Sequence, residues 1–217
     1  MSTAIIGTGG LGSVIARRLA SGGETLRLSS ADTESARTLA AVIGRGAAAA
    51  SDNRDALQGA DAVILALRFG VLKGVIDEIA DSLTDKLVVV PSNPVGLDAQ
   101  GKIVRLLPRR RSSGKAVAGW LPEGARLAMA FGSMSGDLLD SSSNRSPELA
   151  VLFYATDDSR AGKEVERLIR TAGFEPVKVG VIEQSVPFPH ESLRRKGRKG
   201  ARAPSGATWA PRCRWWP

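Results

Sequence analysis

Residues 3–20 read TAIIGTGGLGSVIARRLA. In this stretch a short apolar segment runs into the pattern G-x-G-x-x-G, formed by Gly7, Gly9 and Gly12, and a segment of helical composition follows. In dinucleotide-binding folds the first glycine allows a tight turn, the second lets the backbone approach a pyrophosphate, and the third lets the helix pack against the strand. An ordinary glycine-rich turn is the alternative. The flanking strand and helix favour a phosphate-binding turn at the amino end of a helix.

The rest of the chain alternates between strand-like and helix-like segments. This alternation predicts an α/β fold, with a Rossmann-type, doubly wound and mostly parallel sheet and a small C-terminal extension. The apolar runs DAVILAL (61–67) and KLVVV (86–90) have the composition of strands buried on both faces. Further strands are expected at Glu24–Ser30, Ala47–Ala50, Leu127–Phe131, Ala150–Ala155 and Pro176–Val181, and helices at Thr33–Ile43, Val71–Leu83, Ala116–Leu121 and Arg160–Thr171.

Composition divides the chain into two parts. We expect a dinucleotide-binding Rossmann domain with its small C-terminal portion over residues 1–182, and a basic tail containing Pro and Trp over residues 183–217. After residue 180 eight Lys or Arg face two Glu, so most of the net charge of +8 belongs to the tail. Because the tail has no hydrophobic periodicity, we favour a disordered or atypical extension over a nucleic-acid-binding segment.

The composition also argues against several classes of protein. Cys213 is the only cysteine and His190 the only histidine, which excludes an internal disulfide framework and disfavours a metal site built from Cys and His. No apolar run approaches the ~20 residues that span a bilayer, and no signal-peptide pattern opens the chain. We therefore expect a cytoplasmic protein with no membrane partner and no metal.

The choice between NADP and NAD rests on the end of the second expected strand. NAD-binding folds place an acidic residue about 20 residues past the glycines, on the ribose hydroxyl. Here the strand ends in Ser29 and Ser30, which could donate to a 2′-phosphate, with Arg37 or Arg27 as the charge partner. Asp32 could cap the next helix, or select NAD if the strand ends later. We favour NADP, and leave the alternative open.

These segments, taken in order, resemble the coenzyme F420-dependent NADP oxidoreductase family. The resemblance covers about residues 3–182 and rests on IIGTGGLGSVIARRLA, DAVILAL, VVVPSNP, LPEGARLAMAFGS and VLFYATDDSRAGKEVERLIRTAGFEPVKVG. It implies a Rossmann domain whose small C-terminal portion completes the substrate cleft. It also implies hydride transfer between NADPH and the deazaflavin coenzyme F420, and it is compatible with a homodimer.

The resemblance also implies which residues bind the cofactor and the acceptor. Ser30 would bind the 2′-phosphate, although the neighbouring family arginine is Ala31 here and a later family lysine falls on Ser35. The family segment A-F-N-T reads Ala130-Phe131-Gly132-Ser133, so Gly132 replaces its asparagine. The cofactor-binding candidates are Gly7, Thr8, Gly9, Gly10, Leu11, Gly12, Ser29, Ser30, Arg37, Leu67, Arg68, Ser92, Asn93 and Pro94, and the substrate-binding candidates are Phe131, Gly132 and Ser133.

The leading hypothesis is an NADP-dependent oxidoreductase that passes a hydride between NADPH and a planar small-molecule acceptor, such as F420 or a flavin. Hydride transfer between stacked rings needs orientation rather than a protein nucleophile, and Tyr154 lacks a Lys four residues on, so we predict no catalytic acid–base residue. The basic run Arg109–Arg111 could attract an anionic acceptor or form a solvated loop. The alternatives are an NAD(P)-dependent reductase of a small carbonyl or imine, and a non-catalytic NADP-binding sensor.

Overall fold

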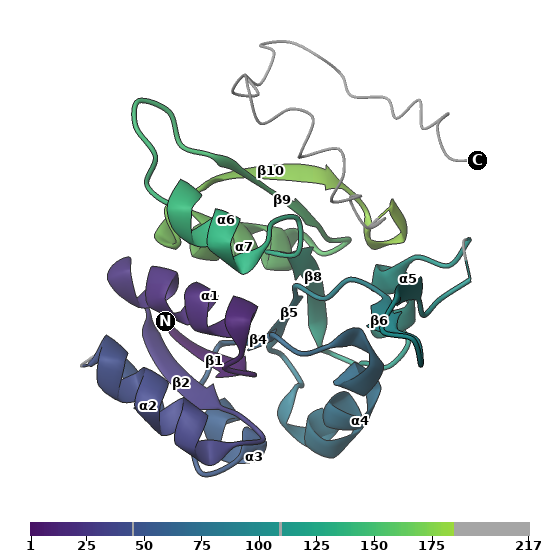
Figure 1. Ribbon diagram of the computed structural model, residues 1–217, viewed down its shortest axis with the longest axis horizontal. Coiled ribbons are helices and arrows are strands. Elements are labelled where there is room, and N and C mark those ends of the chain that lie inside the picture. The colour runs from purple at the N-terminus through teal and green to yellow at the C-terminus, as the bar shows by residue number, and fades with distance from the viewer. Residues whose placement is uncertain (45, 109, 185–217) are drawn as a thin grey trace. The chain divides into compact units, whose positions relative to one another are not determined.

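A computed structural model describes residues 1–184 apart from positions 45 and 109. Its main element is an eight-stranded sheet with the order β10-β9-β8-β5-β4-β1-β2-β3 (Figure 1). The strands are β1 (Ser2–Ile6), β2 (Thr25–Ser29), β3 (Ala47–Ala49), β4 (Ala62–Leu65), β5 (Leu87–Val90), β8 (Arg126–Ala130), β9 (Val151–Ala155) and β10 (Glu175–Gly180). Neighbouring strands are parallel except for β8 and β9, which confirms the predicted α/β, mostly parallel, Rossmann-type sheet.

Helices cover both faces of this sheet. Because side chains alternate along a strand, Ile5 of β1 enters one core and its neighbour Ile6 enters the other. The first core is shared with α1 (Gly10–Ser21), α2 (Thr33–Ile43), α6 (Gly136–Ser142) and α7 (Ser159–Thr171). The second is shared with α3 (Asn53–Leu57), α4 (Phe69–Ile79) and α5 (Ser113–Ala118). The described residues also contain two short 3-10 turns, η1 (Ala80–Ser82) and η2 (Ile182–Gln184).

An ion pair with a buried carboxylate joins two segments that lie far apart in the sequence. Glu24, just before β2, has a side chain only 3 % exposed, and it accepts hydrogen bonds from both terminal nitrogens of Arg167 on α7, at 2.5 and 3.1 Å. Thr3 of β1 donates to the same carboxylate through its hydroxyl at 2.7 Å. The charge is therefore paired and hydrogen-bonded, as a buried carboxylate requires.

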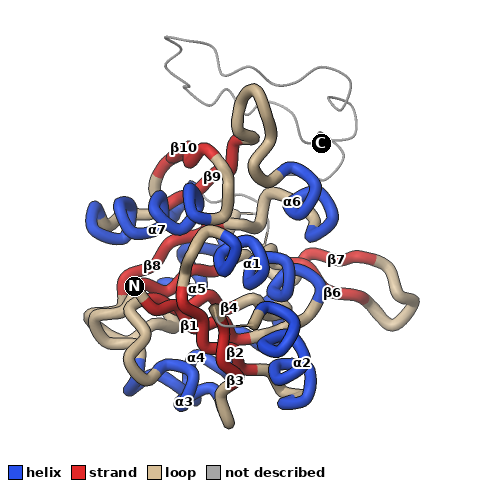
Figure 2. The backbone as a smooth tube through the Cα atoms, turned by 90° about the vertical axis from the view of Figure 1, so that its left-hand side faces the viewer, coloured by secondary structure: helices blue, strands red, loops and turns tan. Residues whose placement is uncertain are grey.

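A small antiparallel hairpin, which the sequence analysis does not predict, follows β5. It consists of β6 (Val95–Leu97) and β7 (Ile103–Arg105), with Leu97 opposite Ile103. In the turn, the carboxylate of Asp98 accepts hydrogen bonds from the backbone N–H groups of Gln100 and Lys102. Figure 2 shows the hairpin extending away from the main sheet, on the side where α1 begins. It therefore lies beyond the carboxyl ends of the parallel strands.

The other differences from the predicted elements are local. α5 occupies Ser113–Ala118 rather than 116–121, because the hydroxyl of Ser112 caps it by accepting from the N–H of Lys115 at 3.0 Å. β4 ends at Leu65, so Leu67 and Arg68 lie in the turn that leads to α4. The helices α3 and α6 are not predicted at all. Most of the expected tail, 183–217, lies outside the described residues.

Candidate cofactor site

The glycine turn between β1 and α1 leaves no room for side chains at its first and last glycines. Gly7 has a φ of +100°, and a Cβ there would lie 2.5 Å from the carbonyl oxygen of Ala66. A Cβ on Gly12 would lie 1.9 Å from the carbonyl oxygen of Gly7. The N–H of Gly7 donates to the carbonyl of Ser29 at 2.8 Å, which fixes the turn against the end of β2. Glycine at both positions is therefore required by the backbone itself.

The middle of the same turn is open. A Cβ on Gly9 or Gly10 would have no atom within 4 Å, apart from its chain neighbours and, for Gly10, the backbone of its own helix. Gly9 is the N-cap of α1 and supplies no side chain to its amino end, so the first amides of α1 have no side-chain cap. The hydroxyl oxygen of Thr8 is buried without a hydrogen-bond partner among the described residues. Open space, free amides and an unpaired hydroxyl fit a pyrophosphate, while Leu11 packs partly buried against the core.

At the end of β2, the two serines predicted to face a 2′-phosphate differ in their burial and in their hydrogen bonds. Ser29 is buried and its hydroxyl donates to Oδ1 of Asn53 at 2.7 Å. Ser30 is only partly buried, and no hydrogen bond of its hydroxyl is found within residues 1–184. Of the two, Ser30 is the residue with a hydroxyl available to a ligand as a donor.

The charged groups near this strand end have distinct roles. The carboxylate of Asp32 is the N-cap of α2: it accepts from the N–H of Glu34 at 3.1 Å and from the hydroxyl of Ser35 at 2.5 Å. These hydrogen bonds, that of Ser35 first, hold the pKa of Asp32 below its usual value. Arg27 pairs with Asp55 of α3, whereas Arg37 is exposed and lies 3.7 Å from Glu34. Arg37 is therefore the more available cation.

The carboxyl ends of β4, β5 and β8 are tied together by two side chains. The hydroxyl of Ser92 donates to the backbone carbonyl of Leu67, and Nδ2 of Asn93 donates to the carbonyl of Gly132 at 2.9 Å. Pro94 is buried, and its carbonyl accepts from the N–H of Leu106 at 2.8 Å. Ser92-Asn93-Pro94 thus holds neighbouring strand ends in register at the edge where parallel sheets bind ligands.

The loop after β8 runs from this edge toward the glycine turn. Phe131 is completely buried with a φ of +64°, so a direct contact between its ring and an acceptor is not supported. A Cβ on Gly132 would lie 2.2 Å from the carbonyl oxygen of Pro91, and one on Gly136 would lie 3.2 Å from that of Gly10. The hydroxyl oxygen of Ser133 is buried without a partner in the described part of the chain. This loop therefore borders both the pyrophosphate turn and the expected nicotinamide position.

Arg68 also lies at this edge. It is exposed and precedes the first residue of α4; its backbone carbonyl accepts from the N–H of Val71 at 3.0 Å, and its side chain makes no hydrogen bond or ion pair with another described residue. Tyr154, in contrast, is only 3 % exposed, and burial together with a hydrogen bond to Glu166 raises its pKa to about 12. Tyr154 is therefore a core residue and no proton donor at the sheet edge.

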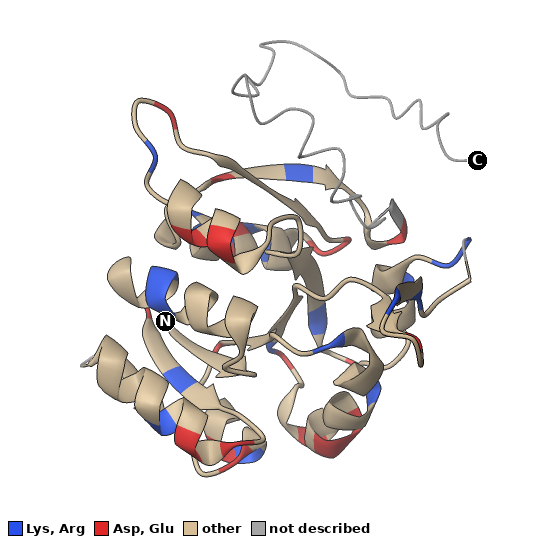
Figure 3. Ribbon diagram, in the orientation of Figure 1, with Lys and Arg blue, Asp and Glu red and all other residues tan. Residues whose placement is uncertain are grey.

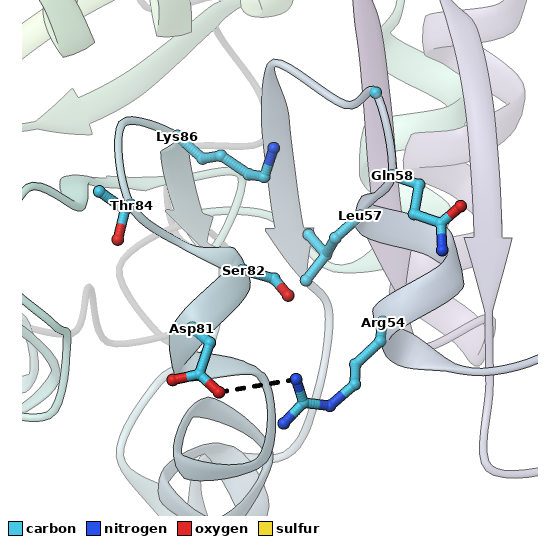
Figure 4. Close-up of a pocket in the computed structure, with 8 residues that line it drawn as sticks. Arg54, Leu57, Gln58, Asp81, Ser82, Thr84 and Lys86 are labelled. Carbon is cyan, nitrogen blue, oxygen red and sulfur yellow. Dashed lines mark ion pairs between the residues drawn. The ribbon is translucent and has the colours of Figure 1, made fainter.

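A hollow of about 340 Å³ lies elsewhere, beside the amino ends of β4 and β5 (Figure 4). In it the guanidinium of Arg54 lies 3.8 Å from Asp81, and Nζ of Lys86 donates to the carbonyl of Ala60. Because ligands of parallel α/β sheets bind at the carboxyl ends of the strands, this hollow is not the predicted site. Among the residues described, no cluster of His, Cys, Asp and Glu could hold a metal, and no helix could span a membrane.

Comparison with known proteins supports the family resemblance. Residues 2–94 match the family model of the coenzyme F420-dependent NADP oxidoreductases, which confirms the resemblance over that part of the chain. No curated protein matches the sequence. The fold and the family match together indicate an oxidoreductase of the NADP-dependent class.

Solved structures share the fold over most of the chain. A hypothetical protein from Sinorhizobium meliloti is 28% identical, covers 87% of this chain and 89% of its own, and has a TM-score of 0.75. A proposed F420-dependent NADP-reductase from Arthrobacter sp. FB24 is 18% identical, with coverages of 90% and 87% and a TM-score of 0.71. An imine reductase from Myxococcus stipitatus in complex with NADP+ is 17% identical, with coverages of 91% and 61% and a TM-score of 0.68.

Proposed function

We propose that this protein is an NADP-dependent oxidoreductase that transfers a hydride between NADPH and a planar acceptor such as coenzyme F420 or a flavin. The observation that carries the proposal is the glycine turn. Side chains are excluded at Gly7 and Gly12 by the protein itself, yet space remains open at Gly9 and Gly10 in front of an uncapped helix. A turn built in this way fits the phosphates of a dinucleotide.

The remaining candidate residues would bind the other parts of such a cofactor, from its 2′-phosphate to its nicotinamide. Ser30, with Arg37 as the nearby cation, would hold the 2′-phosphate, because hydrogen bonds between charged partners are the stronger class. Leu67, Arg68 and Asn93 stand at the strand ends where the nicotinamide would lie. Asp32 does not compete for the ribose in this arrangement, because its carboxylate caps α2.

The protein's part in the chemistry is to position the reactants. A bound nicotinamide supplies the hydride. Asn93 uses Nδ2 to hold Gly132, so its Oδ1 remains to orient a ring or a ribose. Ser92 keeps the ends of β4 and β5 together. Orientation and exclusion of water are the contributions that such a transfer requires from a protein.

Gly132 favours a second candidate, a non-catalytic NADP-binding sensor. The family resemblance places an asparagine at this position, and the carbonyl of Pro91 leaves no room for a side chain there. A reductase of a small carbonyl or imine is the third candidate, although Tyr154 lies in the core and not at the strand ends.

One assay separates these functions. Oxidation of NADPH is followed by absorbance at 340 nm with F420, flavins, quinones and small imines as acceptors, while binding of NADPH and NADH is measured by calorimetry. We expect NADPH to bind and a planar acceptor to be reduced. A protein that binds NADPH but reduces no acceptor favours the sensor, and one that binds neither dinucleotide refutes the proposal.

A further inference from the structure

The hairpin formed by β6 and β7 exposes an apolar face. In an antiparallel pair of strands, residues that lie directly opposite each other share one face. Leu97 and Ile103 are such a pair, and their exposed fractions are 69 % and 70 %. Val95, two residues before Leu97, lies on the same face and is 43 % exposed. Single exposed apolar residues are normal on a protein surface, whereas apolar residues grouped on one face mark an interaction surface.

The packing of the hairpin against α4 turns this face outward. A Cβ on Gly96, which lies on the opposite face, would be 3.0 Å from Cδ2 of Leu106. A Cβ on Gly70 of α4 would be 3.9 Å from Cδ1 of the same leucine. The side chain of Leu106 therefore lies between the hairpin and the start of α4. The face that carries Leu97 and Ile103 points away from α4, on a hairpin that extends away from the main sheet (Figure 2).

The hairpin and the segment that joins it to α5 are basic. Residues 95–115 contain six Lys or Arg and one acid, Asp98. Two of these cations have partners: Arg105 donates to backbone carbonyls, and Lys115 pairs with Glu183 at 2.9 Å. The exposed cations that pair with no acid among the described residues are Lys102, Arg110 and Arg111. The protein therefore leaves positive charge unneutralised on this segment.

These cations lie beside the apolar face. Lys102 directly precedes Ile103 in the sequence. The guanidinium of Arg105 donates to the carbonyls of Leu107 and Arg111, both at 3.0 Å, and so folds the joining segment back on the hairpin. Figure 3 shows Lys and Arg on the hairpin and on this segment. The apolar face and the cations therefore form one surface.

The chemistry of this surface narrows the choice of partner. Surfaces that bind single-stranded nucleic acid stack its bases on aromatic side chains, whereas Val95, Leu97 and Ile103 are aliphatic. A second copy of this chain would bring the same cations together across a two-fold axis, where like charges repel. An anionic bilayer suits both features, because its headgroups attract Lys and Arg and its acyl boundary accepts aliphatic side chains.

We propose that the hairpin binds the surface of membranes that contain anionic phospholipids. Leu97 and Ile103 enter the headgroup region, and the three cations, Lys102, Arg110 and Arg111, contact lipid phosphates and carboxylates. The sequence-based expectation of no membrane partner rested on the lack of a spanning segment, and a hairpin that lies at the membrane surface needs none. The inference does not depend on the proposed function, because it involves no residue of the candidate cofactor site.

The first test measures binding of the full-length protein to vesicles. The protein is sedimented with phosphatidylcholine vesicles with and without phosphatidylserine. We expect phosphatidylserine to strengthen binding at least about tenfold at low salt, and this difference to shrink as salt is added. Because the basic residues after position 184 add to any attraction of this kind, the decision rests on variants of the hairpin.

Two variants have matched controls on other elements. Leu97→Ser, Ile103→Ser is expected to weaken binding at least about tenfold, because two aliphatic side chains no longer leave water. Its control replaces two other exposed apolar residues, Val42 and Leu149, by Ser. The triple variant Lys102→Gln, Arg110→Gln, Arg111→Gln is also expected to weaken binding at least about tenfold. Its control replaces the exposed cations Arg145, Lys163 and Lys178 by Gln. Both controls are expected to stay within about twofold of the wild type.

A fluorescent label reports insertion separately from attraction. Cys213 is the only cysteine, so a Cys213→Ser background allows one labelling site at a time. Leu97→Cys and, as the control, Val42→Cys are labelled with a fluorophore whose emission depends on polarity. We expect phosphatidylserine vesicles to shift the emission to shorter wavelengths at position 97 and not at position 42. NADPH binding, measured by calorimetry, shows that each variant remains folded.

The inference is overturned if either hairpin variant binds vesicles as strongly as its control, or if the label at position 97 shows no shift. Binding of soluble polyglutamate that needs the three cations but neither Leu97 nor Ile103, together with vesicle binding that is equally indifferent to these two residues, overturns it in favour of an acidic protein partner.

Discussion

Asn93 donates through Nδ2 to the backbone carbonyl of Gly132 at 2.9 Å and so joins the carboxyl end of β5 to that of β8. We expect Asn93→Ala to reduce kcat/KM for the acceptor by about tenfold or more, because a lost hydrogen bond of ~1 kcal/mol is compounded by misplacement of the ring. The dissociation constant of NADPH is expected to change by less than about twofold, since most of its contacts lie elsewhere. Both quantities should be measured on one preparation, with circular dichroism as the folding control. If the Asn93→Ala variant keeps the kcat/KM of the wild type, the acceptor binds away from Asn93.

The glycine turn offers a matched pair of substitutions. Gly9→Val has room in the protein alone, so its melting temperature should stay close to that of the wild type, but its side chain occupies the space for the phosphate. We expect the affinity for NADPH to fall by at least ~1.4 kcal/mol, about tenfold. Gly12→Ala meets the carbonyl of Gly7 and should instead lower the melting temperature. Unchanged NADPH binding in a folded Gly9→Val protein contradicts the assignment.

Cofactor choice should depend on Ser30. The variant Ser30→Asp places a carboxylate where the 2′-phosphate is expected, so we expect NADPH to bind at least about tenfold more weakly while NADH is little affected. Asp32→Asn keeps a capping oxygen on α2 and serves as the control, with no change in the NADPH to NADH ratio expected. Calorimetry with both dinucleotides gives the ratio. A wild-type protein that prefers NADH would show that Asp32, or another residue, selects the cofactor.

Stability should fall at acidic pH. The carboxylate of Asp55 accepts hydrogen bonds from the N–H of Ser51 and pairs with Arg27, and these interactions lower its pKa below the usual 3.8, as the hydrogen bonds of Ser35 and Glu34 do for Asp32. The unfolded chain therefore takes up these protons first, so the stabilisation is complete above the usual pKa and is lost as the pH falls through the lowered one.

We accordingly expect the melting temperature to decrease between about pH 4 and pH 2, with a smaller decrease in Asp55→Asn. Thermal melts followed by circular dichroism at each pH provide the measurement. An Asp55→Asn profile that runs parallel to that of the wild type over this range would assign the loss to other groups.

The sequence predicts those parts of the fold that are determined by residues close to one another in the chain. The strand, glycine turn and helix of residues 3–20 follow one another directly, and the strands at 61–67 and 86–90 are recognisable because burial on both faces demands continuous apolar residues. The cap of α2 by Asp32 is equally local. In such cases the chemical reason for the structure is contained in a few neighbouring residues.

The candidate site is less predictable because its contacts join distant segments. Nothing near Ser29 in the sequence indicates that Asn53 takes its hydroxyl, and nothing near Asn93 indicates the carbonyl of Gly132. The hairpin did leave a signal: Asp98 to Gly101 is a turn-forming stretch between two short alternating segments, VGL and IVR. Strands of three residues are too short for that alternation to stand out.

The pairing of Glu24 with Arg167 has a consequence for how the protein is made. The two residues are 143 positions apart, and a buried carboxylate that lacks its cation destabilises a domain by several kcal/mol. A nascent chain that has presented only the glycine turn and the first strands therefore carries an unneutralised charge at the base of its sheet. We therefore expect the amino-terminal half to reach its full stability only when α7 is present, so that folding is completed late in synthesis.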